Sequence, residues 1–355
     1  MSASSLEPLV QFGLIAGAAA VGLNLLLATL ILALRARLNQ RERDQQAFKA
    51  IWQPALLQAL AGPATYVLPP LRPQEQVAFL ELWNYLHESL RGDATVRLND
   101  IGRHLRCDEL ARRLLREGSS AERLLAMLTL GHLRDSHAWS ELEHVARSTD
   151  TIESLKAARA MIQIDPTAAA RELLPAVLTR ADWDVPRLAR ILGYAAPEVF
   201  GSLLAPRISD MPSPQQVRAL ELIEALHIRL PAAELARLLG SQLEPAVIAA
   251  ALRLANAPQL RAATLAHLEH PEWRVRVQAV DAVARTATAS DVQRLAARLG
   301  DREWWVRYRA AHALVALPFR GHQDPVVLKS LTEDRFGRDA LDQVLAERGL
   351  PSHSS

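Results

Sequence analysis

The sequence predicts an all-α fold in which an α-solenoid of stacked helical pairs follows one transmembrane helix. The first observation is a repeat near the C-terminus, where "HPEWRVRVQAVDAVA" is followed, at an offset of 31 residues, by "DREWWVRYRAAHALVAL". A fixed period of about 20–50 residues is typical of stacked repeats. The second observation is an uncharged apolar run near the N-terminus, and the third is a composition that favours helix throughout.

The composition limits the class of protein. The chain has 355 residues, of which 50% are apolar and 23% are charged, enough for several compact cores or one elongated array. The Asn-Gly and Asp-Gly signals of tight hairpins are absent. The single cysteine, Cys107, excludes an internal disulfide framework and fits a reducing compartment. A formal charge of +2 is close to balance and indicates no polyanionic partner.

Residues 9–34 form the apolar run, "LVQFGLIAGAAAVGLNLLLATLILAL", with 26 residues and no charge. As a helix they would be about 39 Å long, enough to cross a hydrocarbon core of about 30 Å. A secretory signal peptide is disfavoured, because the basic residues follow the run instead of preceding it. Gly13, Gly17 and Ala20 share a stripe that would suit helix pairing or lipid packing equally. The run therefore predicts a transmembrane helix.

The basic residues after this run predict its orientation. Arg35, Arg37, Arg41, Arg43 and Lys49 all follow it, and basic residues stay on the cytoplasmic side of a membrane. We therefore expect the N-terminus outside and the C-terminal domain in the cytoplasm. The segment that carries these residues is expected to be a stalk; binding of anionic lipid is a weaker alternative, because two acidic residues dilute its charge.

The repeat can be followed towards the N-terminus in degraded form. The aliphatic position of the two clear copies recurs about every thirty residues between shorter helical runs, so each unit is predicted to be helix, turn, helix. Its occupants are Leu124, Leu155, Val185, Val217, Val247, Val275 and Val306. Alanines at positions 279, 282, 310 and 313 are predicted to let neighbouring helices approach closely. Asp301 is predicted to cap its helix and to receive an arginine from the preceding unit.

The last copy resembles the HEAT repeat in its short bacterial form. The pattern is carried by Asp301, Val306, Arg307, Ala310, Ala313 and Leu314. The resemblance implies a right-handed α-solenoid of HEAT-type helical hairpins, and it is strong for the last two units and weaker before them. Phycobilin-lyase-like enzymes carry related repeats, but no residue here indicates their activity.

The predicted organisation has six parts. They are a short tail (1–8), the transmembrane helix (9–34), a basic juxtamembrane stalk (35–49), an N-terminal helical cap (50–119), the HEAT-like repeats (120–318) and a C-terminal helical cap and tail (319–355). Polar outer faces on terminal caps are what an open-ended stack requires.

No catalytic or metal-binding pattern is found in the sequence. Phosphate loops, dinucleotide-binding glycines, nucleophile elbows and zinc-protease motifs are absent. The histidine pairs at 132/137 and 267/270 lack a carboxylate at ligand spacing. Cys107 is expected to be a passive thiol. We therefore predict a protein that is not an enzyme and has no cofactor.

The candidate partner-binding residues are Trp273, Arg274, Trp305, Tyr308 and Arg309. Aromatic and arginine side chains are typical anchors of protein interfaces. A purely structural interpretation is favoured for the residues that the repeat itself uses. In it, Trp273 and Trp304 fold over the starts of their helices, while Arg276 and Arg307 form salt bridges between units.

The function predicted from these features is a membrane-tethered scaffold that binds a protein partner. The resemblance suggests a place in a bacterial inner membrane, and it alone carries the idea of an accessory role in envelope or exopolysaccharide machinery. The alternative is a HEAT-like DNA-binding protein or DNA glycosylase that uses the tryptophans and arginines. Residues 270–309 hold eight arginines against five acids, a modest excess for a DNA reader, so nucleic acid is not the expected partner.

Overall fold

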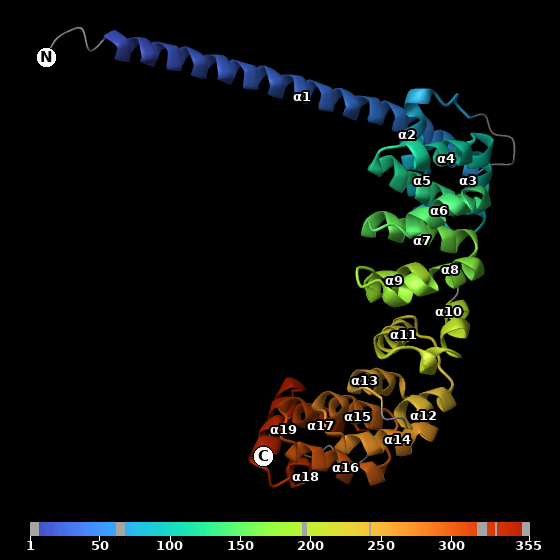
Figure 1. The fold of residues 1–355 in the computed structure, drawn as a ribbon, viewed down its shortest axis with the longest axis vertical. Coiled ribbons are helices and arrows are strands. Elements are labelled where there is room, and N and C mark those ends of the chain that lie inside the picture. The colour runs from blue at the N-terminus through green and yellow to red at the C-terminus, as the bar shows by residue number, and fades with distance from the viewer. Residues whose placement is uncertain are drawn as a thin grey trace. The chain divides into compact units, whose positions relative to one another are not determined.

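The computed structural model describes residues 7–61, 68–193, 197–240, 243–317, 325–330 and 332–349; of these, the side chains of 7–25, 37–39, 41–42, 325–326 and 328 lie outside the description. Every regular element in the described residues is an α-helix or a short 3-10 helix, which confirms the all-helical prediction. The chain divides into two compact units, Met1–Asp135 and Ser136–Ser355, each with its own hydrophobic core (Figure 1).

The first unit packs four helices around the end of a long one. Its helices are α1 (Glu7–Ala61), α2 (Gln76–Ser89), α3 (Asp93–His104), α4 (Cys107–Glu117) and α5 (Ser120–Leu133), and the 3-10 turn η2 (Pro73–Glu75) leads into α2. Trp52 of α1 and Trp83 of α2 are at most 2% exposed in its core. The indole N–H of Trp83 donates to the carbonyl of Leu98 at 2.8 Å, so this large ring is buried without leaving its donor unsatisfied.

Helix α1 continues without a break from the predicted transmembrane segment through the predicted stalk into this core. Pro54 lies inside it, where the missing N–H removes one backbone hydrogen bond but does not end the helix. Among the side chains that the structure describes, no helix carries an apolar stretch long enough to cross a bilayer. Residues 9–25 of the predicted span 9–34 lie outside those side chains. The transmembrane helix is therefore not confirmed and stays a prediction.

The second unit is a succession of helical pairs. One helix of each pair belongs to the row α7 (Thr151–Ile164), α9 (Val185–Leu192), α11 (Ser213–Ala225), α13 (Pro245–Leu254), α15 (Trp273–Arg285), α17 (Trp304–Ala316) and α19 (Arg335–Glu347). The other helices are α6 (Trp139–Ala146), α8 (Pro166–Thr179), α10 (Pro197–Leu204), α12 (Ala232–Gly240), α14 (Arg261–Ala266), α16 (Val292–Ala297) and α18 (Pro325–Ser330). Successive helices of the first row begin 28 to 34 residues apart.

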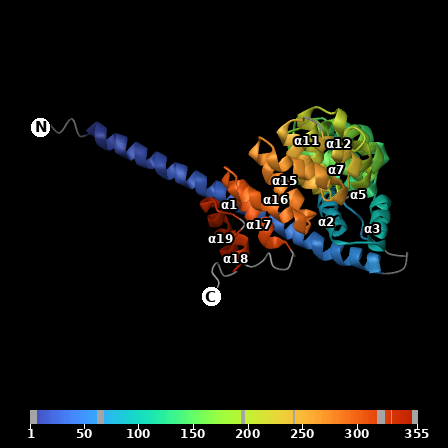
Figure 2. The same cartoon turned by 90° about the horizontal axis from the view of Figure 1, so that it is seen from below.

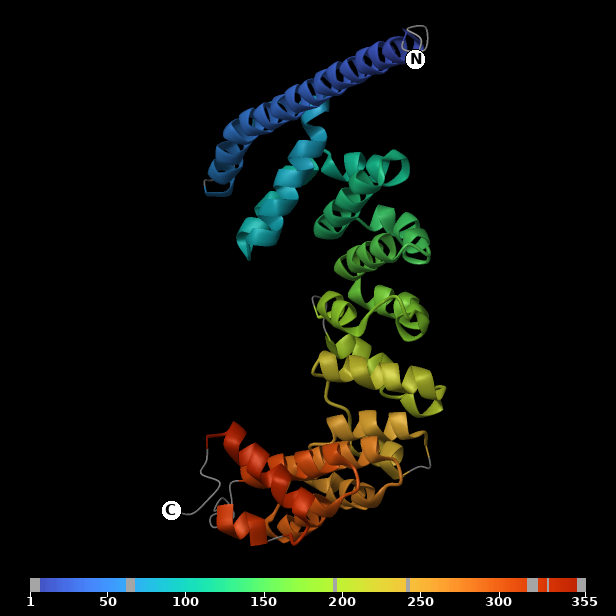
Figure 3. The ribbon, with the colours of Figure 1, turned by 90° about the vertical axis from the view of Figure 1, so that its left-hand side faces the viewer.

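Successive helices of the first row pack on one another. From α11 onwards, each contacts the next in the order α11, α13, α15, α17 and α19. Figure 3 shows these pairs lying one upon the next from yellow to red, and Figure 2 shows α19 beside α17 at the end of the row. This arrangement is the predicted stacking of helical pairs. Its right-handed sense stays a prediction.

Four of the seven residues predicted at the repeat position are buried, while Leu124, Val185 and Val217 are only half-buried. Val247, Val275 and Val306 are fully buried, and the predicted alanines are 0–5% exposed. Alanine at these positions adds little side-chain bulk, so α15 and α17 can pack directly against each other. The prediction that small residues allow the helices to approach is confirmed for these two helices.

Long-range side-chain hydrogen bonds repeat with the same period. Arg180 donates to the carbonyl of Ser148, 32 residues earlier, and Arg285 donates to the carbonyl of Ala255, 30 residues earlier. Arg298 donates to the carbonyl of Leu268, also 30 residues earlier. Each acceptor is one pair away in the stack. Arginines therefore satisfy carbonyl groups near helix ends that the helices themselves leave open.

The pair formed by α18 and α19 continues the stack within the segment predicted as a cap. At the same offset of 31 residues, Gly337 takes the place that Val306 has in α17. A Cβ atom at Gly337 would lie 2.7 Å from the carbonyl oxygen of Leu299. The last pair therefore approaches the preceding one more closely than an aliphatic side chain would allow.

This close approach predicts the effect of Gly337→Ala. The added methyl group meets backbone rather than a movable side chain, so we expect a loss of about 1–3 kcal/mol in the free energy of unfolding. Urea denaturation of the full chain measures it. The control is Gly240→Ala, where a Cβ atom would meet nothing within 4 Å. Equal stability of the two variants would contradict the close packing of α19 on Leu299.

Candidate functional site

Three of the five predicted partner-binding residues line one groove. Trp273, Trp305 and Arg309 are among the walls of a hollow of about 540 Å³. Glu224, Arg253, Val277, Gln278, Asp281 and Arg285 complete its lining. These residues come from α11, α13, α15 and α17, four successive helices of the first row in Figure 1. The groove therefore crosses several helical pairs instead of lying within one.

The helix period explains why these side chains share a face. Residues 273, 277, 281 and 285 follow one another at intervals of four on α15, and Trp305 and Arg309 are spaced in the same way on α17. Side chains at that spacing lie along one side of a helix. The opposite side of α15 holds buried residues such as Val275 and Ala279. Because the side of α15 with Val275 and Ala279 is buried in the stack, the side with residues 273, 277, 281 and 285 faces the groove.

Arg309 is held in place by a bidentate ion pair. Its guanidinium donates to both carboxylate oxygens of Asp281, at 2.5 to 3.1 Å, across a separation of 28 residues. Arg253 donates one hydrogen bond to Glu224, at 2.6 Å, and lies 3.6 Å from a carboxylate oxygen of Glu221. Burial lowers the pKa of Arg285, which donates to backbone carbonyls below the groove. The cations of the groove are therefore fixed and largely neutralised.

The aromatic residues form a connected cluster beside Arg309. The rings of Trp304 and Trp305 meet edge to face with centroids 4.6 Å apart, and Tyr308 stacks on Trp304 at 5.1 Å. Trp305 is 53% exposed and Trp304 is 40% exposed. Trp304 thus packs against the next turn of its own helix, as the structural interpretation expects, yet keeps a large exposed ring surface. Exposed tryptophan pairs are uncommon on a surface that contacts only water.

The two other predicted residues lie outside the lining of the groove. Tyr308 donates its hydroxyl hydrogen to Glu347 of α19 at 2.8 Å, and this bond to a carboxylate raises the pKa of Tyr308. Arg274 lies over the ring of Trp273, with its guanidinium carbon 4.8 Å from the ring centroid. It also pairs weakly with Glu272 at 3.4 Å. Arg274 contacts Trp273 and Tyr308 contacts Trp305, so each of them packs against a tryptophan that lines the groove.

An ion pair beneath the site joins α15 to the turn before α17. Arg276 donates to both oxygens of Asp301 at 2.7 Å, and the two side chains are only 6% and 5% exposed. The Asp301 carboxylate also accepts the backbone N–H of Glu303 at 2.9 Å. The predicted link between units is therefore confirmed for Arg276. The helix starts after Glu303, so Asp301 binds the turn before α17 rather than capping it.

Arg307 differs from the salt bridge predicted for it. It donates to the carbonyls of Asp301 and Arg302 and lies over the ring of Phe336, with its guanidinium carbon 5.4 Å from the ring centroid. The physical reason lies in the next pair, where Thr332 stands 31 residues after Asp301 and offers no carboxylate. The Phe336 ring of α19 receives the cation instead.

Cys107 is buried, and burial raises the pKa of its thiol to about 12. It is therefore protonated at neutral pH, in agreement with the passive role expected from the sequence. In the described parts of the chain, no three His, Cys, Asp or Glu side chains come together as a metal site would require. The prediction that the protein has no cofactor stays a prediction.

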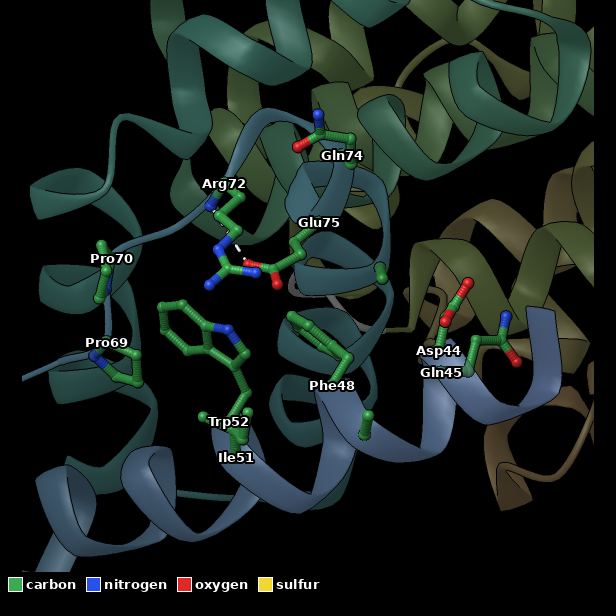
Figure 4. A pocket seen from close by; sticks show the side chains of 12 residues that line it. Asp44, Gln45, Phe48, Ile51, Trp52, Pro69, Pro70, Arg72, Gln74 and Glu75 are labelled. Atoms are coloured by element: carbon green, nitrogen blue, oxygen red, sulfur yellow. Dashed lines mark hydrogen bonds between the residues drawn. The ribbon is translucent and has the colours of Figure 1, made fainter. Parts of the chain in front are cut away.

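A second hollow, in the first unit, was not predicted from the sequence. It has a volume of about 850 Å³ and lies between α1, the extended segment before η2, and α2. Figure 4 shows the Trp52 ring facing Pro69 and Pro70, with Arg72 and Glu75 across the opening. The only sequence signals are the spacing of Phe48 and Trp52 on a helix face and the proline-rich stretch that follows α1.

The comparison with known proteins identifies one region of the chain. Residues 261–348 match the family of HEAT repeats. No curated protein matches the chain. The match runs from α14 to the end of α19, so it includes both helices that carry Trp273, Trp305 and Arg309. It also extends into the segment that the sequence suggested as a C-terminal cap.

The Arg276–Asp301 pair predicts a pH-dependent contribution to stability. Burial alone would raise the pKa of Asp301, but hydrogen bonds from Arg276 and Glu303 lower it below its ordinary value of 3.8. Because the pKa is lower in the folded protein than in the unfolded chain, ionised Asp301 stabilises the fold at pH values above 3.8. This stabilisation is lost as the pH falls through the pKa of the folded protein. For Asp301→Asn we therefore expect about 3 kcal/mol less stability at pH 7, because Arg276 remains buried without its partner.

Urea denaturation at a series of pH values measures this difference. The gap between wild type and Asp301→Asn should begin to shrink as the pH falls below 3.8, where Asp301 of the unfolded chain takes up a proton. It should close as the pH falls through the lower pKa that Asp301 has in the folded protein. Asp339→Asn, which removes an exposed carboxylate of α19, is the control and should leave the stability nearly unchanged. A gap that is constant with pH would contradict the role given to the ion pair.

Proposed function

We propose that this protein is a non-enzymatic, membrane-tethered scaffold that binds a protein partner in the groove across α11, α13, α15 and α17. HEAT repeats commonly mediate protein–protein interaction, and stacked repeats present extended binding surfaces. The observation that carries the proposal is the meeting of Trp273, Trp305 and Arg309 in one groove.

The groove has the physical character of a protein-binding surface. Tryptophan and arginine supply most of the large contributions to affinity at protein interfaces. Trp305 offers an exposed ring, and Arg309 is held by Asp281 before any partner arrives. A side chain that is already ordered loses less conformational entropy on binding. These features favour a few fixed anchors that contact a partner's surface.

The charges of the groove favour a protein over a nucleic acid. Arg253 and Arg309 each pair with a carboxylate, and Arg285 is occupied by backbone carbonyls. A DNA-binding surface gains affinity from arginines that neutralise phosphates and release counterions. Arginines already neutralised by Glu224 and Asp281 supply little of that gain.

The membrane tether is part of the proposal because of the apolar run at 9–34. In its described part, Leu26, Leu30 and Leu32 are between 54% and 65% exposed on α1. Exposed leucines so close together are costly in water and stable in hydrocarbon. The basic residues that follow the run support a cytoplasmic placement of the second unit. The resemblance to short bacterial HEAT repeats supports a bacterial cell. Anchoring would raise the effective concentration of the groove near partners at the membrane.

Crosslinked pull-down of the full chain from membranes tests the binding groove. We expect Trp305→Ala to lower the recovery of specific partners at least tenfold, because loss of a central tryptophan anchor costs about 2 kcal/mol or more. A second variant, Arg309→Ala/Asp281→Ala, removes both charges together and leaves neither unpaired. The control is Tyr85→Ala, which removes an exposed aromatic ring from the first unit. If all variants recover the wild-type set of proteins, the groove is not the binding site.

Reporter fusions test the proposed orientation. A fluorescent protein fused to the C-terminus should be bright and an alkaline phosphatase fused there should be inactive, because the phosphatase requires an oxidising compartment. Removal of residues 9–34 should release the chain from the membrane fraction. Phosphatase activity at the C-terminus would overturn the cytoplasmic placement, and a chain that stays soluble with these residues present would overturn the tether.

A further inference from the structure

A hollow on the first unit, separate from both hollows described above, is lined mainly by arginine. It has a volume of about 560 Å³ and lies between α4 and the first residue of α2. Arg106, Arg112, Arg113 and Arg116 line it together with Glu109. Gln76, Leu105 and Leu110 complete the lining. Four cations against one anion is a local excess that the nearly balanced composition of the chain does not predict.

The helix period brings Glu109, Arg113 and Arg116 to one side of α4, because they follow one another at intervals of four and three and so form one stripe. Arg106, in the turn before α4, lines the same hollow. The rise of an α-helix separates Glu109 from Arg116, the two ends of this stripe, by about 10 Å along the axis. The stripe is therefore long enough to contact two anionic groups of one ligand, or one phosphate group together with the group esterified to it.

The turn before α4 fixes the position of Arg106. Its backbone is in the left-handed region, at φ 56° and ψ 36°, where a side chain is strained and glycine is favoured. The backbone N–H of Arg106 donates to Arg103, and its carbonyl accepts from Leu110. The turn is thus held by backbone bonds on both sides, and it directs a long cation to the start of the stripe.

The partners of these arginines differ in strength. Arg112 is held by the carboxylates of Asp108 and Asp135 and is 20% exposed, so it is a fixed part of the wall. Arg106 pairs with Glu109 on the surface, where its side chain is 73% exposed and such a pair contributes little. Arg113 donates to the side-chain oxygen of Gln76, a neutral acceptor, at 3.0 Å. A stronger anion can therefore take over the donors of Arg106 and Arg113.

We propose that this hollow, which we call the α4 arginine site, binds a phosphate ester. The guanidinium group presents several N–H donors in a rigid fork that matches the oxygens of a phosphate, often through two bonds at once. A volume of about 560 Å³ is within the usual range for a small ligand. Arg106 and Arg113 bind the phosphate oxygens, Arg116 adds its positive charge at the end of the stripe, and Gln76 is freed to bind an ester oxygen. The ligand is either a phospholipid headgroup or a soluble phosphate compound.

Phosphorus NMR of two probes tests the site and separates these sources. The full chain in neutral detergent is titrated with pyrophosphate, which represents soluble phosphate compounds, and with glycerophosphoglycerol, the headgroup of an anionic lipid without its acyl chains. Ionic strength is held constant. We expect saturable broadening of the phosphorus signal of at least one probe, and a loss of affinity of at least tenfold in Arg113→Gln/Arg116→Gln.

The control variant is Arg187→Gln/Arg190→Gln, which removes two exposed arginines of α9 and should bind like wild type. Arg113→Lys keeps the charge but not the fork, and it should bind with intermediate affinity. Binding of pyrophosphate alone identifies a soluble ligand, and binding of glycerophosphoglycerol alone identifies a lipid headgroup. The proposal would be overturned if neither probe showed saturable binding up to roughly 10 mM. It would also be overturned if the Arg113→Gln/Arg116→Gln variant bound the probes as tightly as wild type.

Discussion

Burial between neighbouring helical pairs is the constraint on which the second unit depends. A single pair of antiparallel helices has two apolar sides and can cover only one of them by itself. Val275 and Ala279 of α15 are therefore buried only because α13 and α17 pack on either side. The same requirement fixes which stripe of each helix remains for solvent or a partner. The groove is lined by side chains on the stripes of these helices that do not pack against a neighbouring helical pair.

Arginine has a second, structural role in this stack. Apolar contacts hold the helices together but do not fix their register, whereas the Arg276–Asp301 pair and the arginine bonds to carbonyls each require one relative position. The same residue type serves in the groove as Arg309, held by Asp281. The residue type alone does not distinguish an arginine that links helical pairs from one that lines the groove. Burial does, since Arg276 is 6% exposed and Arg309 is 38% exposed on their side chains.

The sequence was sufficient to predict the period of the fold where the repeat keeps its valine, arginine and alanines. The register at Val275 and Val306 follows from those residues, and so does the arginine link to Asp301. The continuation of α1 past Pro54 could not be predicted in this way, because a proline normally ends or kinks a helix and only the packing of Trp52 shows that it does not do so here.

The sites were predictable to different degrees. The residue types of the groove identified Trp273, Trp305 and Arg309, but the bond from Tyr308 to Glu347 joins residues 39 apart and depends on how the last pair packs. The hollow at Trp52 was missed because α1 and the segment before α2 meet only in the folded chain. Seven of the eight residues that line the α4 arginine site lie within residues 105–116, so its arginines are visible in the sequence, and only the approach of Gln76 required the structure.

The continuity of α1 has a mechanical consequence. Its 55 residues make a rod about 80 Å long that contains no loop between the apolar run and the aromatic residues around Trp52. Under the proposed tether, a flexible linker would let the first unit turn independently of the membrane-bound segment. With a continuous rod, any rotation about the long axis must carry the first unit with it, so the angular position of residues 9–34 would set the direction in which that unit faces.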